Sequence, residues 1–499
     1  MLARLKQFFL RNTSPKQTIA KNVAWLTLGE IFGRLIRMLF VIYVARILGA
    51  EGYGVFSYVL GLAGFFTMFS SAGVSSVFLR NASQTPKSRY EFFSVTFFIQ
   101  LVLLILTIAL VIFVAPLFSH IVGVRLLFVF ASFLIAFDGF RGLAFAVFRF
   151  SERMELEALT AVVTNLAITG FGFLAIFLAP NPLSLIMAYA AGAGVGALIG
   201  TLLLKNWFAR IFRCFQKDLI RPILLTTSAM FLTTVFGRFM FHIDMIMLGW
   251  WRSAEEIGLY AAAQRIVFLL IVLPDILAVS VFPLLSRLVK LGDSDRVERL
   301  MERSVILLFS ISLPLVVGGI VLARPLLIFV YGQGFASSSL FLQLLLFSLL
   351  LLFPSRIILN FIFVHNKQRI IATSAGVGAF GNVVLNVFLI PAYGAAGSAI
   401  GTFFSLLINQ GFLWYVAKRL QPFRTFRYLP RIFIASLLGP GILAYVLYYF
   451  AGLHVLMVIL LSALFYFAFL YILRDPVITE FQSIFRRFLS SSHSNTQSS

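Results

Sequence analysis

Four arginines lie inside long apolar stretches, where a guanidinium group could bind an anion. Arg34 and Arg37 stand three residues apart in the first stretch, so they share one face of a helix. Arg238 and Arg265 lie in the seventh and eighth stretches. Because arginine holds a phosphate group with two parallel hydrogen bonds, these side chains are candidates for binding an anionic head group.

Such charges are costly in a membrane. One mid-membrane arginine costs about 2.5–3.5 kcal/mol on insertion scales, so it must pair, reach the membrane surface or face water. Glu30 lies one helical turn before Arg34, and neutralising that arginine is one role open to it. Arg356 lies near the end of the tenth stretch, where we expect it to reach the surface. Basic groups still outnumber acidic ones around the four candidates, which favours a shared cationic cleft.

Carboxylates in the apolar stretches are candidates for coupling transport to a proton or a sodium ion: Glu30, Asp138, Asp244 and Asp275. Asp138 precedes Arg141 by three residues, and a structural ion pair is the favoured interpretation for it. Asp275 follows Pro274, where a broken helix would free carbonyl groups for a cation. A kinked helix with a paired carboxylate explains Asp275 at least as well.

Signals of an enzyme are absent or weak. The sequence has no G-x-x-x-x-G-K-[ST] loop and no Cys/His cluster with metal-site spacing. Asp293-Ser294-Asp295 has the D-x-D form with which metal-dependent glycosyltransferases hold a nucleotide sugar, but turn chemistry after Gly292 explains it better. We therefore expect a transporter rather than an enzyme, with no cofactor and no metal.

The elements that must position these residues are membrane-spanning helices. Hydrophobic residues make up 61% of the 499-residue chain, charged residues 12%, and the mean hydropathy is +0.99, whereas a soluble domain carries about 25% charge. We count about fourteen apolar stretches long enough to span a membrane, which predicts an all-α integral membrane protein. They lie roughly at 22–47, 52–78, 92–115, 122–147, 158–180, 182–204, 221–249, 256–286, 304–330, 336–364, 370–390, 394–417, 431–450 and 454–473.

The net charge of +22 is spread over loops rather than gathered in one domain. Lys and Arg cluster in alternate loops, which by the positive-inside rule predicts that both termini lie in the cytoplasm. Nucleic-acid binding is the weaker interpretation, because no basic domain stands apart. We expect the first stretch to act as the insertion signal, and the single cysteine, Cys214, excludes an intrachain disulfide.

The chain contains one six-span unit twice. Phe32-Gly33-Arg34 matches Phe236-Gly237-Arg238 at a shift of 204 residues, which also places Gly54 on Gly258. An even number of spans in each copy relates the copies by an axis along the membrane normal. The sequence therefore predicts two parallel six-helix repeats followed by a pair of extra helices.

The predicted organisation has five parts: a basic cytoplasmic N-terminus at 1–20, a first six-helix lobe at 21–210, a second at 211–428, helices 13 and 14 at 429–475, and a cytoplasmic tail at 476–499. Within the second lobe we expect residues 288–303 to form a polar cytoplasmic loop. Gly192, Gly196 and Gly200 recur every fourth residue, which predicts close helix packing rather than a ligand site.

Motifs typical of one transporter family occur along the whole chain. The turn at Ala45–Gly54 reads A-R-x-L-G-x-x-x-Y-G, and further family-like stretches are Gly73–Arg80, Phe148–Arg153, Phe282–Ser286 and Gly381–Gly397. In these stretches the chain resembles the polysaccharide exporters of the multidrug/oligosaccharidyl-lipid/polysaccharide (MOP) superfamily. These exporters are the O-antigen-type flippases of lipid-linked oligosaccharides.

The resemblance implies a V-shaped pair of six-helix lobes that works by alternating access in the plasma membrane of a prokaryote. It also implies export of an isoprenoid pyrophosphate-linked glycan from the inner to the outer leaflet, with a polysaccharide polymerase and glycosyltransferases as candidate partners. The cationic cavity is a family feature, and its placement on the four arginines is our own inference. Flippases of peptidoglycan lipid precursors and cation-coupled multidrug exporters share the architecture and stay open as alternatives.

Overall fold

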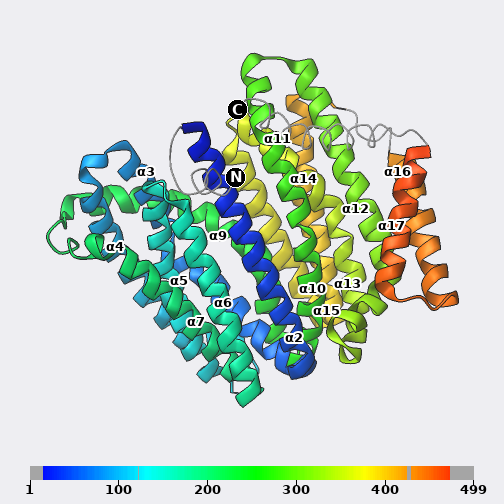
Figure 1. The fold of residues 1–499 in the computed structure, drawn as a ribbon, viewed down its shortest axis with the longest axis horizontal. Helices are drawn as coiled ribbons and strands as arrows, with labels where there is room; N and C mark the ends of the chain where they lie inside the picture. The colour runs from blue at the N-terminus through cyan, green and yellow to red at the C-terminus, as the bar shows by residue number, and fades with distance from the viewer. Residues whose placement is uncertain (1–14, 122, 424–428, 473–499) are drawn as a thin grey trace, which may run out of the picture. The chain divides into compact units, whose positions relative to one another are not determined.

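The structure is a computed structural model that describes residues 15–121, 123–423 and 429–472, and these residues form helices joined by turns (Figure 1). The predicted all-α class is therefore confirmed. The chain divides into two compact units, unit 1 at Met1–Gly258 and unit 2 at Leu259–Ser499. Most of the predicted basic N-terminus and the whole predicted tail at 476–499 lie outside the described residues.

Unit 1 is built on a long first helix that is divided by a glycine. Gly49 has φ 67° and ψ −178°, which glycine adopts without steric cost, and it splits α2 at the turn predicted between the first two apolar stretches. The helices of unit 1 are α2 (Pro15–Ser71), α3 (Val74–Gln84), α4 (Arg89–Ala109), α5 (Val124–Phe150), α6 (Met154–Leu178), α7 (Pro182–Leu203), α8 (Lys205–Phe208) and α9 (Ile220–Trp251).

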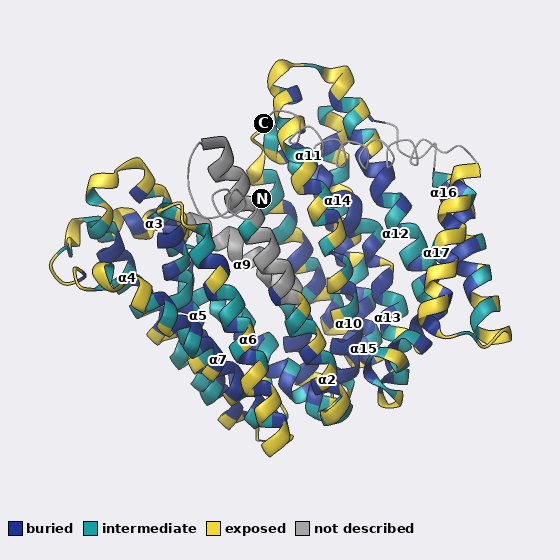
Figure 2. Cartoon of the chain, in the orientation of Figure 1, coloured by how far each residue is buried: buried dark blue, intermediate teal, exposed yellow. Residues whose placement is uncertain are grey.

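Unit 2 begins within α10 (Ala254–Leu270) and also contains a long helix that is divided by a glycine. Gly394, with φ 61° and ψ −140°, divides α15 between the predicted eleventh and twelfth spans. In Figure 2, α17 carries mostly exposed residues, as expected of a helix that faces lipid. The helices are α11 (Val272–Leu291), α12 (Ser294–Tyr331), α13 (Ser339–Leu346), α14 (Ser348–Val364), α15 (Gln368–Leu420), α16 (Leu429–Ser436) and α17 (Val455–Ile472), with π-helical turns at Leu437–Leu443 and Val446–Phe450.

The helices are long and apolar enough for a protein that crosses a membrane many times. Within the described residues, 11 segments meet this condition by length and composition. Two of them, Leu35–Gln84 and Gln368–Leu420, each contain two predicted spans, and α9 holds a further predicted span that is not among the 11. The multi-pass architecture follows, while the total of about fourteen crossings stays a prediction.

Close helix packing at the predicted glycines is confirmed in unit 1. An added Cβ atom on Gly192 would lie 2.5 Å from the Ile168 backbone nitrogen, and one on Gly196 would overlap the Thr164 hydroxyl. Both glycines lie on α7 and both contacts lie on α6. The small residues therefore let α6 and α7 approach closely, as expected for helices that associate inside a membrane.

The region at 288–303 is helical rather than the predicted loop. α11 continues to Leu291 and α12 begins at Ser294, so two residues separate the helices. Asp293 caps α12 by accepting a hydrogen bond from the Arg296 backbone N–H at 3.2 Å, and its other oxygen lies 3.3 Å from Arg296 Nε. The loop prediction was wrong because acidic residues here compensate the helix dipole and so favour a helix. The cap also gives the first aspartate of the D-x-D motif a structural role.

The two units contain the same backbone turn. After α5, Glu152 has φ 54°, and after α14, Asn366 has φ 58°. In each case the next residue donates its backbone N–H to the carbonyl five residues earlier, at 2.9 Å after Glu152 and 3.3 Å after Asn366. This is the hydrogen bond of a Schellman motif, formed here without glycine at the left-handed position. A duplicated unit would contain such a turn at equivalent points.

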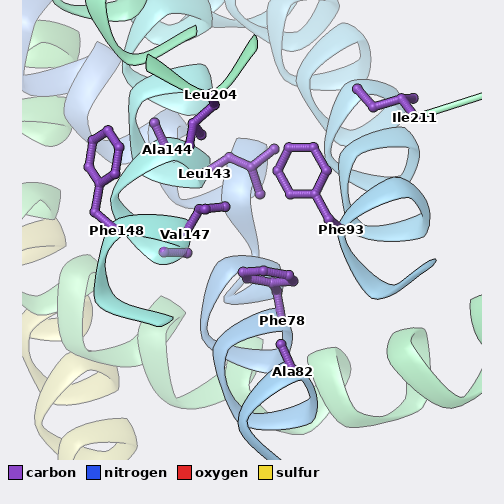
Figure 3. Packing of buried hydrophobic residues seen from close by; sticks show 10 residues of the cluster. Phe78, Ala82, Phe93, Leu143, Ala144, Val147, Phe148, Leu204 and Ile211 are labelled. Carbon is purple, nitrogen blue, oxygen red and sulfur yellow. The ribbon is translucent and has the colours of Figure 1, made fainter. Parts of the chain in front are cut away.

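The helix ends of unit 1 meet in a cluster of buried rings (Figure 3). Phe78 of α3, Phe93 of α4 and Phe148 of α5 belong to this cluster. Trp207 of α8 packs on it, with its ring centroid 6.2 Å from that of Phe78 and 5.3 Å from that of Phe93. The turns after α3, α5 and α7 therefore lie at one end of unit 1, and all three carry clusters of Lys and Arg.

Candidate functional site

Arg37 lies on the face of α2 that packs against α6. Its Nη2 donates a hydrogen bond to Asn165 Oδ1 at 2.6 Å. Glycines allow this close approach, because an added Cβ on Gly33 would overlap the Asn165 amide and one on Gly172 would overlap the Phe40 ring. The neutral Asn165 amide orients the guanidinium group. Sequence reasoning found Arg37 but missed Asn165, whose only signal was an amide in an apolar stretch.

Three further predicted residues are placed by their backbone alone. Glu30 and Arg34 lie on α2 and Arg238 lies on α9, and their side chains are outside the described part of the structure. Arg37 belongs to unit 1 and Arg265 to unit 2. The shared cationic cleft of these four arginines therefore stays a prediction.

Arg265 is an exposed cation on α10. Within the described ranges no carboxylate lies at ion-pair distance from it. An apolar helix that carries an exposed guanidinium group can offer it to an anion, to water or to the membrane surface. The role of Arg265 in binding an anion stays a prediction.

The second half of α2 packs against the end of α9, a helix that also carries a buried carboxylate. An added Cβ on Gly64 would lie 3.5 Å from His242, and one on Gly249 would overlap the Tyr58 ring. Asp244, between these contacts on α9, is 1% exposed. The charge of a carboxylate at such a buried position is costly to hold unless it is paired or hydrogen-bonded. The role of Asp244 in ion coupling stays a prediction.

The repeat-related segments Ala50–Gly54 and Ala254–Gly258 meet backbone to backbone, and we call this the reciprocal glycine contact. An added Cβ on Gly54 would overlap the Ala254 carbonyl oxygen, and one on Gly258 would overlap the Ala50 carbonyl oxygen. The contact is the same in both directions, as expected around a local two-fold axis. Neither position accepts a side chain unless the backbone moves.

Asp138 and Arg141 form an ion pair on α5. Arg141 Nη2 lies 2.7 Å from Asp138 Oδ1. The Arg141 guanidinium also lies 5.7 Å from the centre of the Phe145 ring. The favoured interpretation of a structural pair is thus met in its geometry, while the alternative role of Asp138 in ion coupling stays untested.

Asp275 pairs with an arginine of another helix in unit 2. Arg356 Nε on α14 lies 2.9 Å from Asp275 Oδ1 on α11. Among the described residues, the N–H group at this nitrogen is not aligned for a hydrogen bond. One turn along α14, Asn360 Nδ2 donates to the Ala278 carbonyl at 3.0 Å. We expected Arg356 to reach the membrane surface. It pairs instead because α11 packs against α14 and so brings Asp275 within reach of Arg356.

Neutralising either Asp275 or Arg356 should lower the free energy of unfolding of unit 2. Neutralising both should lower it by less than the sum of the two single effects. Both side chains are partly exposed, so we expect Asp275→Asn to lower the free energy of unfolding by about 1–2 kcal/mol, between surface and buried ion pairs. Thermal unfolding in detergent of Asp275→Asn, Arg356→Gln and the double variant measures the coupling. Combining Asp275→Asn with Arg287→Gln, an exposed arginine of the same helix, should be additive. Additivity in the Asp275/Arg356 cycle would refute a stabilising pair.

An apolar cavity of about 370 Å³ lies inside unit 2. Its walls come from α10, α12, α13, the π-helical turn Leu437–Leu443 and α17. Gly318, Gly319 and Pro440 are among its lining residues, and an added Cβ on Gly318 would lie 2.9 Å from Pro440 Cβ. Ser462 is one of its few polar groups. A cavity with such a lining fits a hydrocarbon chain.

A buried amide network joins the two halves of α15. Asn386 Nδ2 donates to Asn382 Oδ1 at 2.9 Å, and Asn382 Nδ2 donates to Ser405 Oγ at 3.2 Å. Sequence reasoning noted these asparagines as motif residues without a contact. The network satisfies polar groups that would be costly inside a membrane.

The chain is similar to known protein families and to a named relative. A family model described as polysaccharide biosynthesis protein matches residues 19–289, more than half of the chain. A second model, described as MatE, matches residues 229–388. A protein named probable low-salt glycan biosynthesis flippase, from Haloferax volcanii, is 22% identical over 397 residues, which cover 78% of this chain and 82% of the relative.

Solved structures share the fold at low sequence identity. A lipid II flippase in an inward closed conformation has a TM-score of 0.73 at 17% identity and covers 92% of this chain and 99% of that protein. A multidrug resistance transporter of the MATE family of the MOP superfamily, in an inward-facing conformation, has a TM-score of 0.64 at 17% identity and covers 80% and 99%. These likenesses confirm an all-helical, multi-pass membrane fold.

Proposed function

Because the chain belongs to the polysaccharide biosynthesis protein family, whose members are membrane flippases and transporters rather than enzymes, we propose that it moves an isoprenoid pyrophosphate-linked oligosaccharide from the inner to the outer leaflet. The name of the Haloferax volcanii relative supports a glycan as the cargo. The observation that carries the proposal is Arg37, a cation fixed inside an apolar helix by the neutral Asn165 amide. A pyrophosphate is the part of this substrate that a guanidinium group binds strongly.

The proposed mechanism is alternating access between two lobes. We propose fourteen crossings, made of six-helix lobes at 21–210 and 211–428 in a V-shaped arrangement and two further helices at 429–475, with both termini in the cytoplasm. The reciprocal glycine contact supports the paired repeats, because it joins residues that the repeat shift makes equivalent. The shared turn at Glu152 and Asn366 supports them independently.

Ion coupling is proposed through one of the carboxylates Asp244, Asp275, Glu30 and Asp138. At Asp138 and Asp275 a mobile cation would compete with the arginine that pairs with the carboxylate. Asp244 is 1% exposed on α9, where a change of its charge would carry a large desolvation cost. One charge that crosses 100 mV supplies about 2.3 kcal/mol to transport.

The lipid part of the substrate and the protein partners complete the proposal. The apolar cavity of unit 2 suits an isoprenoid chain in its chemistry. Glycosyltransferases that build the glycan and a polymerase that extends it are the proposed protein partners.

The proposal is tested by glycan export in a strain that lacks the chromosomal copy. The wild-type protein should restore glycan at the cell surface, whereas Arg34→Ala/Arg238→Ala should leave the lipid-linked glycan on the cytoplasmic side. The reason is that this variant removes two of the four predicted contacts to pyrophosphate. Equal amounts of both proteins in the membrane fraction serve as the control, and full export by the double variant would refute the cationic cleft.

Two alternatives give different results in the same strain. A multidrug exporter would extrude a fluorescent cation from cells that make no lipid-linked glycan. An arginine-lined cleft disfavours that outcome, because like charges repel. A flippase of peptidoglycan precursors would instead rescue growth of cells depleted of their own precursor flippase.

A further inference from the structure

Two arginines lie over one tyrosine ring at the end of unit 1 whose buried cluster Figure 3 shows. The guanidinium carbon of Arg210 lies 4.5 Å from the centre of the Tyr90 ring, and that of Arg89 lies 5.0 Å from it. Tyr90 is held in turn by Trp207, with 4.8 Å between ring centres. The two guanidinium groups are thus within about 10 Å of each other, which is one Debye length at 0.1 M salt, so they repel each other.

This pair of charges has no acidic partner within the described ranges, in contrast to a neighbouring arginine. At the same end, Arg149 makes two hydrogen bonds to the buried carboxylate of Glu157, at 2.6 and 2.9 Å. Arg89 and Arg210 are exposed and contact the ring of Tyr90 instead. A ring face holds a guanidinium group in position but neither cancels its charge nor uses its in-plane N–H donors. The pair is therefore positioned to receive an anion.

An exposed aromatic side chain lies beside the pair. Phe212 is 85% exposed, and its ring centre lies 5.7 Å from that of Phe98 on α4. The segment that carries it is anchored, because the Ser94 hydroxyl donates to the Ile211 carbonyl. A large apolar side chain next to basic groups is typical of the boundary between lipid head groups and acyl chains.

We propose that Arg89 and Arg210 bind the phosphate group of an anionic phospholipid, with Phe212 placed among its acyl chains. The charge of the pair selects an anion, and Phe212 selects one that carries hydrocarbon. This site needs the membrane architecture but not the transported glycan, so it stands apart from the proposed cargo. It holds a resident lipid against the ends of α4 and α7.

Cys214 provides a reporter for this site. It is the only cysteine in the chain, and its backbone N–H donates to the Arg210 carbonyl at 3.0 Å. The full-length protein in detergent is labelled there with an environment-sensitive fluorophore and titrated with short-chain phosphatidylglycerol, with phosphatidylcholine of equal chain length, and with inorganic phosphate. We expect saturable binding of phosphatidylglycerol, at least tenfold tighter than that of the other two ligands.

Variants separate the site from general charge effects. Arg210→Gln and Arg89→Gln should each raise the apparent Kd for phosphatidylglycerol about tenfold, as expected when a charge-assisted hydrogen bond is lost. Arg125→Gln removes the same charge from an exposed arginine at the other end of α5 and should leave the Kd unchanged. Thermal unfolding without lipid identifies any variant that fails to fold.

Three outcomes would overturn the proposal. One is equal affinity for phosphatidylglycerol and phosphatidylcholine, and another is an effect of Arg125→Gln as large as that of Arg210→Gln. The third is inorganic phosphate that binds as tightly as phosphatidylglycerol, which would assign the pair to free phosphate. Loss of phosphatidylglycerol affinity in Phe212→Ser, with phosphate binding unchanged, would support the lipid as the source.

Discussion

Replacing Arg37 by alanine should lower glycan export about a hundredfold, while the protein should still reach the membrane. The guanidinium group lies inside an apolar helix, where its N–H donors contribute more to binding than they would in water. Removing one partner of such a charged contact costs about 2–5 kcal/mol, and 2.7 kcal/mol corresponds to a hundredfold. The measurement is the initial rate of export at equal amounts of protein in the membrane.

The Asn165 contact decides whether Arg37 acts on the substrate or only on the fold. Asn165→Ala removes the amide that orients Arg37 but keeps the charge, so we expect a loss of about tenfold. Arg37→Lys keeps the charge without the planar donors and should be intermediate. If Arg37 only tied α2 to α6, Asn165→Ala would lower export as much as Arg37→Ala, and the thermal unfolding midpoint would fall in parallel. That pattern would contradict a role in substrate binding.

Replacing Gly54 by alanine should lower export at least tenfold, because the reciprocal glycine contact has no space for a Cβ atom. The added methyl group would overlap the Ala254 carbonyl oxygen, and backbone cannot rotate away as a flexible side chain can. Overpacking of this kind costs about 1–3 kcal/mol. Gly258→Ala should act alike. Export rate and thermal unfolding midpoint are measured together for both variants.

The control for this prediction is alanine at glycines with open space. Gly142 on α5 and Gly170 on α6 have no atom within 4 Å of an added Cβ, so alanine there should leave export unchanged and stabilise the helix slightly. The double variant Gly54→Ala/Gly258→Ala should lower export and the unfolding midpoint by less than the two single effects combined, since one backbone shift relieves both overlaps. Wild-type export in Gly54→Ala would show that this contact is not part of the transport cycle.

Helices and their breaks could be predicted because they depend on local properties of the sequence. Apolar length set the spans, and the structure breaks the helices at Gly49 and Gly394, which lie at the gaps predicted between closely joined spans. Residues 288–303 were misjudged because their charges were interpreted as solvation, whereas acidic groups at a helix start stabilise the helix itself. The pair of Asp138 with Arg141 was predictable for the same local reason, a spacing of one helical turn.

Contacts between distant residues could not be predicted. Arg37 with Asn165, and Asp275 with Arg356, join helices whose relative rotation no local pattern reveals. Arg356 was therefore expected at the membrane surface although its partner lies on another helix. The contact between Arg210 and Tyr90 could not be predicted for the same reason. The sequence is enough to identify the charged residues, whereas the structure is needed to identify their partners.

The reciprocal glycine contact also bears on how such a transporter evolves. In an ancestor made of two identical six-helix subunits, the same contact would have been isologous, and one substitution would have acted at two places at once. Fusion of the two genes removes that restriction, and at the equivalent positions Phe40 and Asp244 the two halves now differ. Gly54 and Gly258 each face backbone from the other copy, which leaves neither half free to change alone. We therefore expect residues at contacts between the two halves to be the last to diverge after duplication.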